Sequence, residues 1–431
     1  MGLGYVGLPL AITFAKVQES YLMKEKLSRI VYGFDIDKKR VDELKNGYDK
    51  TNEVSEYDLI SQENIKFTNN FKDLLECDVF IITVPTPIDK FKKPDLNPLK
   101  KVSKLVGKII SLRNNNNLPI IIYESTVYPG ATEEVCVPII EAESNLLLNI
   151  DFFIGYSPER INPGDKKHNL QTIVKVTSGS TIDSADWINC LYGSIIKAGT
   201  HQASSIRIAE AAKVIENTQR DLNIALINEL AFIFNKLDIS TSEVLEAAGT
   251  KWNFLNFKPG LVGGHCIGID PYYLTYKAES IGYYPKVVLA GREINDAVSN
   301  WVVEQMVINL SKNKIAIEGT DLLILGFAFK ENCNDFRNTK VIEIIKNVNS
   351  YRMNPIVVDP YVNKEEAYNN HGVSIIEKIP PRRTYKAIIL AVAHDQFKLI
   401  KKSEWEDIKD NNAVIIDVKN IIPKEIKAIR L

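Results

Sequence analysis

The chain has 431 residues, a hydrophobic content of 45%, a charged content of 25% and a formal net charge of −1. This length supports two or three domains with large cores, and the balanced charge excludes an overall field that recruits nucleic acid or a membrane surface. Five widely spaced cysteines without a C-x-x-C pair argue against a disulfide framework and a structural zinc site. With no signal-peptide pattern and no apolar run that could span a bilayer, we expect a cytoplasmic protein.

The N-terminal segment carries a phosphate-binding pattern. Gly2-Leu3-Gly4-Tyr5-Val6-Gly7 fits G-x-G-x-x-G and leads into an expected helix over residues 8–16. Such glycines permit a tight turn and the close approach of a pyrophosphate, whose charge a helix N-terminus favours. The motif should follow a strand, but here it follows Met1. Either the start is misassigned, or the chain lacks the first strand of its sheet.

An acidic residue follows the next expected strand. Residues 30–34 are apolar and lead into Asp35, whose carboxylate can bind ribose hydroxyls and favours NAD over NADP. Arg40 tempers this preference, because an arginine could also meet a 2′-phosphate. Residues 18–28 read as a polar insertion that lengthens the spacing between the glycines and the acid.

Further buried strands are expected over residues 78–84, 119–123 and 152–156, with helices between them. This alternation predicts a doubly wound parallel α/β domain. Thr86 and Thr126 follow two of these strands, where ligands bind in open parallel sheets. Turn formation and helix capping are the alternative roles of the two threonines.

Residues 201–237 contain no glycine or proline and mix apolar and polar residues at helical spacing. We expect a long helix that bridges two domains and offers a dimer interface. Lys213 and Asn217 lie four residues apart and therefore share one face of this helix. A solvated polar face is the alternative reading of that pair.

The glycine-rich stretch 260–270 contains Cys266, with the carboxylate of Asp270 four residues later. Glycines let the backbone approach a ligand closely, so a thiolate here could act as a nucleophile. A buried structural cysteine beside a tight turn is the alternative, because free cysteine is among the most buried residue types. After this stretch, four buried strands over 322–330, 355–361, 387–394 and 413–417 predict a second, smaller parallel-sheet domain.

Seven motifs then occur in order along nearly the whole chain. They are the glycine motif, Val84-Pro85-Thr86-Pro87, Glu124-Ser125-Thr126-Val127, Ser157-Pro158-Glu159-Arg160, Lys213 with Asn217, Gly263-Gly264-His265-Cys266 and Gly326-Phe327-Ala328-Phe329-Lys330. Together they resemble the UDP-glucose/GDP-mannose dehydrogenase family. Residues 250–273 are most similar to its UDP-N-acetylglucosamine/galactosamine 6-dehydrogenase branch, with the UDP-N-acetylmannosamine branch second.

The resemblance implies two Rossmann-like doubly wound parallel-sheet domains joined by a long central helix. The expected divisions are an NAD-binding domain over 1–198 whose first strand is missing, a helical dimerisation region with the cysteine loop over 199–305, and a UDP-sugar domain over 306–431. The implied reaction is the NAD-dependent, four-electron oxidation of the C6 hydroxyl of a UDP-N-acetylhexosamine by a homodimer, through a cysteine thiohemiacetal and thioester. Capsule or O-antigen synthesis is the implied pathway.

The resemblance also assigns residues. Those implied in catalysis are Cys266, Lys213, Asn217, Asp270 and Glu159. Those implied in NAD binding are Gly2, Gly4, Tyr5, Val6, Gly7, Asp35, Arg40, Thr86, Thr126 and Arg337. Those implied in substrate binding are Arg160, Ile161, Lys213, Asn217, Arg220, Lys251, Asn253, Gly263, Phe329 and Lys330. The chain has Pro163 where UDP-glucose dehydrogenases have a second glutamate, which leaves the hydrolytic base open among Glu159, Asp270 and Lys213.

Two other functions compete with this one. The first is a UDP-N-acetylmannosamine dehydrogenase, since the sequence alone does not set the sugar stereochemistry at C2 or C4. The second, from a different class, is a UDP-sugar-binding pseudoenzyme that no longer holds NAD because the first strand is missing. The presence of all five implied catalytic residues favours an active enzyme.

Overall fold

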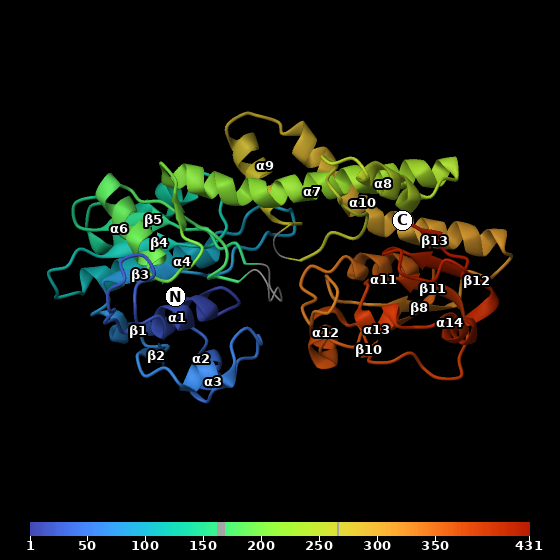
Figure 1. Cartoon of the computed structure of the whole chain (residues 1–431), viewed down its shortest axis with the longest axis horizontal. Helices are drawn as coiled ribbons and strands as arrows, with labels where there is room; N and C mark the ends of the chain where they lie inside the picture. Colours follow the sequence, from blue (N-terminus) through green and yellow to red (C-terminus); the bar gives the residue numbers. More distant parts are fainter. Residues whose placement is uncertain (162–168, 265–266) are drawn as a thin grey trace. The chain divides into compact units, whose positions relative to one another are not determined.

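The computed structural model describes residues 1–161, 169–264 and 267–431, and shows an α/β chain whose sheets are built from parallel strand pairs (Figure 1). Two compact units emerge from its internal packing. The first contains Met1–Glu216 and Tyr272–Gly282, and the second contains Asn217–Pro271 and Tyr283–Leu431. The predicted α/β class with parallel sheets is confirmed. The expected divisions at residues 198 and 305 stay predictions.

The first unit alternates strands and helices. Its elements are α1 (Gly7–Lys16), β1 (Val31–Phe34), α2 (Lys38–Lys45), α3 (Glu56–Ile60), β2 (Ile65–Thr68), the 3-10 helix η1 (Phe71–Leu74), β3 (Val79–Ile82), α4 (Asn97–Ser111), β4 (Ile120–Tyr123), the π-helical turn η2 (Thr132–Cys136), α5 (Val137–Ser144), β5 (Phe153–Tyr156), β6 (Lys175–Thr177), α6 (Ile182–Gly193) and β7 (Thr200–Gln202). Strand β1 pairs with β2, the order β3-β4-β5 forms a second sheet, and β6 pairs with β7.

Residues 1 and 2 connect the first two of these sheets. The Gly2 amide donates to Phe34 O at the end of β1 (2.9 Å), and the Met1 amine donates to Ile81 O in β3 (2.7 Å). The Thr83 amide returns a hydrogen bond to Met1 O (2.9 Å). Residues 1 and 2 therefore lie where the last residues of a strand between β1 and β3 would lie.

A cavity of about 860 Å³ runs along the facing edges of β1 and β3. Its walls include Val31, Val79 and Ile81 from the strands and Leu10 and Phe14 from α1. It follows the strands themselves, whereas ligands of open parallel sheets bind beyond the carboxyl ends. We therefore do not assign it to the cofactor.

Helix α1 packs on both of its sides. Leu8 and Ile12 pack with α2 and the β1–β2 pair, and Leu10 and Phe14 pack with β4 and α6. Because residues 3.6 apart share a helix face, this pattern buries α1 from two directions. Helix α1 is therefore held between two hydrophobic clusters of the first unit.

Helix α7 (Ile206–Leu237) is one unbroken helix, as Figure 1 shows. The long helix expected over 201–237 is confirmed from Ile206 onward, but its expected start is wrong. Residues 200–202 instead form β7, which pairs in parallel with β6 through Lys175 and Thr200. The helices that follow are α8 (Thr241–Gly249), α9 (Asp270–Ser280) and α10 (Lys286–Lys312).

The second unit contains a six-stranded parallel sheet of order β10-β9-β8-β11-β12-β13. Its elements are β8 (Asp321–Leu325), α11 (Val341–Ser350), β9 (Asn354–Val358), α12 (Lys364–His371), β10 (Ile375–Ile376), β11 (Tyr385–Leu390), α13 (Asp395–Lys398), α14 (Lys402–Ile408), β12 (Lys409–Asp417) and β13 (Ile429–Arg430). The four expected strands are confirmed. The edge strands β10 and β13 were not expected, since two-residue strands carry no periodicity.

Strand β8 shows how the two faces of this sheet are covered. Leu322 and Ile324 pack with α10 and α11, whereas Leu323 and Leu325 pack with α13 and α14. The side-chain period of two thus sends alternate residues into different helix layers. This arrangement is the doubly wound pattern that the sequence predicted. Within the part of the chain that the structure describes, no helix is both long and apolar enough to cross a membrane.

Candidate functional site

The glycine motif forms a tight loop at the N-terminus of α1. A side chain on Gly7 would place its Cβ 1.9 Å from Gly2 O and 2.3 Å from the Thr83 hydroxyl, so only glycine fits there. The Thr83 hydroxyl itself donates to Gly2 O (2.8 Å). The first turn of α1 contains no acidic residue, and Val6 provides no side-chain cap. An uncapped helix N-terminus beside a glycine loop is suited to a phosphate.

Asp35 and Arg40 both hold this loop. The Asp35 carboxylate accepts a hydrogen bond from the Leu3 amide (2.7 Å), and the Arg40 guanidinium donates to Leu3 O (2.9 Å). Arg40 is buried and pairs with Asp49 at 2.7 Å. Burial alone would raise the pKa of Asp49, but hydrogen bonds from Thr51 and Arg40 lower it. The positive charge of Arg40 is therefore matched by an ionised carboxylate inside the fold.

Thr86 and Thr126 are half-buried in the loops after β3 and β4. Neighbouring hydroxyls hold these loops: Thr83 contacts the glycine motif, and Ser125 donates to Val84 O (2.6 Å). Ligand contacts by Thr86 and Thr126 stay predictions.

Glu159 lies beyond the carboxyl end of β5, within a group of charged side chains. Its carboxylate accepts hydrogen bonds from the amides of Arg160 and Ile161 (both 2.6 Å) and lies 3.5 Å from the Lys175 ammonium. Arg160 donates to Val174 O (2.8 Å) and pairs with Glu216 of α7 (2.7 Å). The structure thus fixes Glu159 in one orientation and gives Arg160 a partner on the long helix.

Helix α7 carries Lys213, Asn217 and Arg220. Lys213 and Asn217 are buried, and Arg220 is exposed. The Asn217 amide donates to the carboxylate of Asp270, the first residue of α9, at 2.6 Å. Asp270 is only 1% exposed. The structure therefore brings together two residues that the sequence assigned to catalysis from positions 53 residues apart.

The cysteine loop is anchored on its N-terminal side. Gly260 is clamped by Asn228 of α7, whose amide donates to Gly260 O (3.1 Å) and accepts from Gly260 N (2.8 Å). Gly264 has a φ of +81°, and a Cβ there would lie 2.9 Å from the ring of Phe329. Only glycine suits both that backbone conformation and that contact. Cys266 itself lies outside the described residues.

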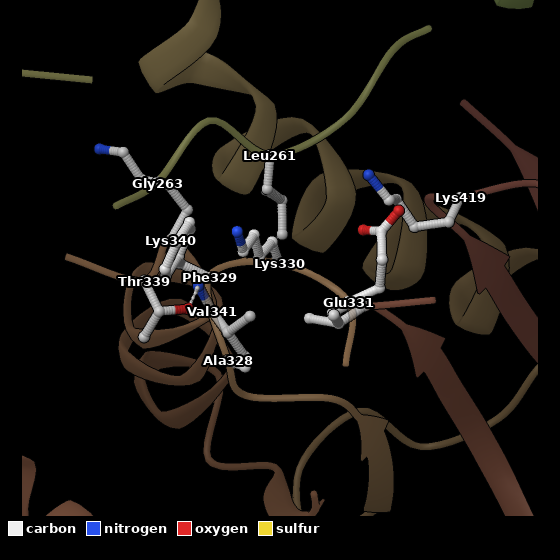
Figure 2. Close-up of a pocket in the computed structure, with 12 residues that line it drawn as sticks. Leu261, Gly263, Ala328, Phe329, Lys330, Glu331, Thr339, Lys340, Val341 and Lys419 are labelled. Atoms are coloured by element: carbon white, nitrogen blue, oxygen red, sulfur yellow. Dashed lines mark hydrogen bonds between the residues drawn. The ribbon is translucent and has the colours of Figure 1, made fainter. Parts of the chain in front are cut away.

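Three predicted substrate residues line one small pocket in the second unit (Figure 2). Gly263 comes from the loop before the cysteine, and Phe329 and Lys330 come from the loop after β8. The Lys330 ammonium lies 5.5 Å from the centre of the Phe329 ring, within cation–π range. Lys340 and Lys419, which the sequence did not single out, also line this pocket.

The remaining predicted residues lie elsewhere on their own units. Lys251 and Asn253 are exposed in the segment after α8. Arg337 is half-exposed and forms an ion pair with Asp335 at 2.8 Å. No metal-binding group of three or more His, Cys, Asp or Glu occurs in residues 1–161, 169–264 and 267–431.

Sequence reasoning missed several residues that hold the predicted ones in place. These are Thr83, Asp49, Lys175 and Asn228. Each is a single polar side chain with no distinctive motif around it. The residue that it holds in place lies between 9 and 81 positions away in the sequence. The one available signal was indirect, because a polar residue on the buried face of a helix, such as Asn228, needs a partner.

We expect Asn228→Ala to destabilise the protein. The change leaves the buried amide and carbonyl of Gly260 without their partners, which costs about 1–3 kcal/mol for each unsatisfied group. Urea unfolding followed by circular dichroism measures this loss. Asn223→Ala is the matched control, because the Asn223 side chain donates within its own helix, to Gln219 O (2.7 Å). Equal stabilities of the two variants would contradict the assigned clamp.

The chain matches known protein families, sequences and structures over nearly its whole length. Residues 1–196 match the NAD binding domain of the UDP-glucose/GDP-mannose dehydrogenase family, 207–297 match its central domain and 323–424 match its UDP binding domain. A UDP-N-acetyl-D-glucosamine 6-dehydrogenase of Salmonella typhi is 52% identical over 100% of this chain and 97% of its own length. Protein CapL of Staphylococcus aureus is 52% identical over 98% of this chain and 95% of its own length. The structure of a UDP-D-ManNAc dehydrogenase from Pyrococcus horikoshii has a TM-score of 0.86 and 28% identity, covering 100% of this chain and 97% of that one.

Proposed function

Because the chain belongs to the UDP-glucose/GDP-mannose dehydrogenase family, whose members are NAD-dependent, we propose that it oxidises the C6 hydroxyl of a UDP-N-acetylhexosamine to a carboxylate. The observation that carries this proposal is the 52% identity over the whole chain to a UDP-N-acetyl-D-glucosamine 6-dehydrogenase. UDP-GlcNAc or UDP-GalNAc is the proposed substrate. UDP-ManNAc is the second candidate, favoured by the fold shared with the Pyrococcus horikoshii enzyme.

The proposed roles divide along the chain. Residues 1–198 would bind NAD, 199–305 would dimerise and carry the cysteine loop, and 306–431 would bind the UDP-sugar. Cys77, Cys136 and Cys190 are free thiols in the part of the chain that the structure describes, which fits a reducing compartment such as the cytoplasm. Capsule or O-antigen synthesis is the proposed use of the product.

The residues around the glycine motif fit NAD. The close contact between Gly7 and Gly2 leaves room for a backbone cradle but none for a side chain, and α1 begins there without an acidic residue. The pyrophosphate would lie at this helix N-terminus, beside Gly2, Gly4, Tyr5, Val6 and Gly7, and the ribose would lie near Asp35. Bound NAD supplies the hydride acceptor.

The protein residues supply the remaining chemistry. Lys213 and Asn217, one turn apart on α7, would stabilise the C6 oxygen as its proton leaves. The Cys266 thiolate would add to the C6 aldehyde as a thiohemiacetal, and the second oxidation would leave a thioester. Water would then attack the thioester carbon, releasing the carboxylate and the thiol, with Asp270 or Glu159 taking the proton of the water.

An assay with three substrates tests this function. Purified protein is given NAD and, separately, UDP-GlcNAc, UDP-GalNAc or UDP-ManNAc, and NADH is followed by absorbance. We expect NADH with at least one of the first two sugars, at a higher kcat/KM than with UDP-ManNAc. The reverse order would establish the second candidate. UDP-sugar binding by calorimetry without any NADH would establish the pseudoenzyme.

We expect the unmodified enzyme to prefer NAD to NADP. A 2′-phosphate would meet the Asp35 carboxylate, and the charge of Arg40 is already matched by Asp49. Asp35→Ala should raise the KM for NAD by about tenfold, which corresponds to about 1.4 kcal/mol. Asp37→Ala, which removes a neighbouring carboxylate that caps α2, is the control. Equal kcat/KM values of the unmodified enzyme for NAD and NADP would contradict the assignment.

A line of exposed apolar residues on α7 supports the proposed homodimer. Ile208, Ile215, Leu226, Ile233 and Leu237 are 45–62% exposed. At about 100° per residue, all of them lie within about 20° of the line through Ile208. Soluble proteins rarely leave large apolar patches in water, so a second copy of α7 is the natural partner of these residues.

We expect Ile215→Glu with Leu226→Glu to shift the protein from dimer to monomer. Two charges would have to be buried without partners if the helices stayed paired. Light scattering at micromolar concentration measures the mass. Lys236→Glu changes an exposed residue of α7 off this line and should leave the dimer intact. A monomeric unmodified protein would rule out the interface.

A further inference from the structure

Lys175 is a buried lysine to which the proposed reaction assigns no role. Lys175 is the first residue of β6 and is 3% exposed. Its ammonium lies 2.8 Å from the carboxylate of Glu124 and 3.5 Å from that of Glu159. The aromatic face of Tyr192 lies 5.2 Å from the same ammonium. One cation thus lies between two carboxylates inside the first unit.

The other members of this cluster hold the lysine still. Glu124 follows β4 and is 2% exposed, and its second oxygen accepts a hydrogen bond from the Tyr192 hydroxyl of α6. Burial and the nearby Glu124 raise the pKa of Tyr192 well above its usual value, so this hydroxyl keeps its proton and donates. Three elements, β4, β6 and α6, therefore meet at the ammonium.

The charges of the cluster depend on one another. Burial alone would lower the pKa of Lys175, but Glu124 and Glu159 raise it, so the lysine stays charged. Burial raises the pKa of Glu124, and Glu159 adds to this effect while Lys175 opposes it. The ammonium of Lys175 therefore offsets the repulsion between the two buried carboxylates. Burial lowers the pKa of the Met1 amine, which also interacts with Glu124, to about 6, so this amine is largely uncharged at neutral pH.

Glu159 differs from Glu124 in what else it contacts. Its other oxygen is fixed by the amides of Arg160 and Ile161, at the start of the segment that carries the predicted substrate residues. Lys175 is therefore placed to set the direction of the Glu159 carboxylate, while Glu124, on the other side of the ammonium, balances the charge of the lysine.

We propose that Lys175, seated on Glu124, is a positioning residue that holds the Glu159 carboxylate in the orientation needed for the hydrolysis of the thioester and places a positive charge beside it. The inference rests on the proposed function, because it assigns Glu159 a part in that reaction. It adds two residues, Lys175 and Glu124, that act through a third without contacting the substrate themselves.

The test compares the unmodified enzyme with three variants, Lys175→Met, Lys175→Arg and Lys175→Met with Glu124→Gln. Steady-state NADH formation from the active UDP-N-acetylhexosamine is measured between pH 5.5 and 9, and folding is checked by circular dichroism. Lys175→Met removes the positive charge between two carboxylates, so the acidic limb of the pH profile of kcat should move up by about one to two pH units. Lys175→Arg should keep most of the original profile.

The double variant separates the effect of the net charge of the cluster from the effect of orienting Glu159. It also keeps the inference testable if Lys175→Met alone does not fold. It has the same net charge as the original cluster but no ammonium beside Glu159. Its acidic limb should return toward the original pH, while kcat stays at least about tenfold low and the KM for both substrates changes less than about twofold.

The contrary outcomes are distinct. A merely structural ion cluster predicts lower melting temperatures with unchanged pH profiles and kcat, and that result would overturn the inference alone. An unmodified enzyme that forms no NADH from any UDP-N-acetylhexosamine would overturn the proposed function, and this inference with it.

Discussion

Cys266→Ala is expected to abolish net turnover while leaving the binding of UDP-sugar and NAD intact. Without the thiol the aldehyde has no covalent carrier, so the second oxidation loses its route. Lys213 and Asn217 could still assist the first step. Loss of a covalent route lowers kcat by about three orders of magnitude or more. Steady-state NADH formation measures this loss, and calorimetry with UDP-sugar checks that binding remains.

Cys333→Ser provides the matched control for this prediction. Cys333 lies after the pocket residue Lys330, is partly buried and accepts a hydrogen bond from the Asp335 amide (3.3 Å), so the change keeps an acceptor in place. We expect this variant to keep most of the activity. If Cys266 were only a buried structural residue, Cys266→Ala would lower stability through a small cavity and keep near-normal rates.

Asp270→Asn is expected to lower turnover by about 10²–10⁴-fold, the usual contribution of a general acid or base. The substitution removes the buried negative charge but keeps the shape of the side chain. The new amide can still accept the hydrogen bond that Asn217 now donates to Asp270. The fold should therefore survive, and kcat should fall with little change in the melting temperature.

Exchanging the two partners tests whether the carboxylate must stand at position 270. Asn217→Asp with Asp270→Asn restores an acid–amide hydrogen bond in the opposite sense. We expect this double variant to regain any lost stability but no activity. Recovery of turnover would instead mean that the pair serves only to join α7 to α9.

The sequence predicted the fold wherever periodicity was strong. The four buried strands of the second unit and the helix from Ile206 to Leu237 were expected, although the strand expected over 322–330 ends at Leu325 and the one expected over 413–417 begins at Lys409. The errors fall where tertiary pairing decides local structure. The helix was expected to begin at residue 201, but residues 200–202 form β7, because β6 offers them a parallel partner.

The residues of the candidate site could be predicted from the sequence, but the residues that hold them in place could not. A family resemblance transfers positions such as Glu159, Asn217 and Asp270, whereas their hydrogen-bond partners are set by packing across long sequence separations. Lys175 shows the difference. Nothing in its local sequence indicates a buried ammonium, which exists only because β4, β5 and β6 bring two glutamates to it. The pairing of Arg40 with Asp49 was hidden in the same way.

The central claim is that one enzyme carries a UDP-N-acetylhexosamine through two successive oxidations. The most direct test counts products at the end point, with UDP-sugar limiting and NAD in excess. We predict two NADH and one UDP-uronate for each UDP-sugar consumed, and no 6-aldehyde captured by a carbonyl-trapping reagent in solution. One NADH per UDP-sugar, with the trapped aldehyde as the product, would contradict the account.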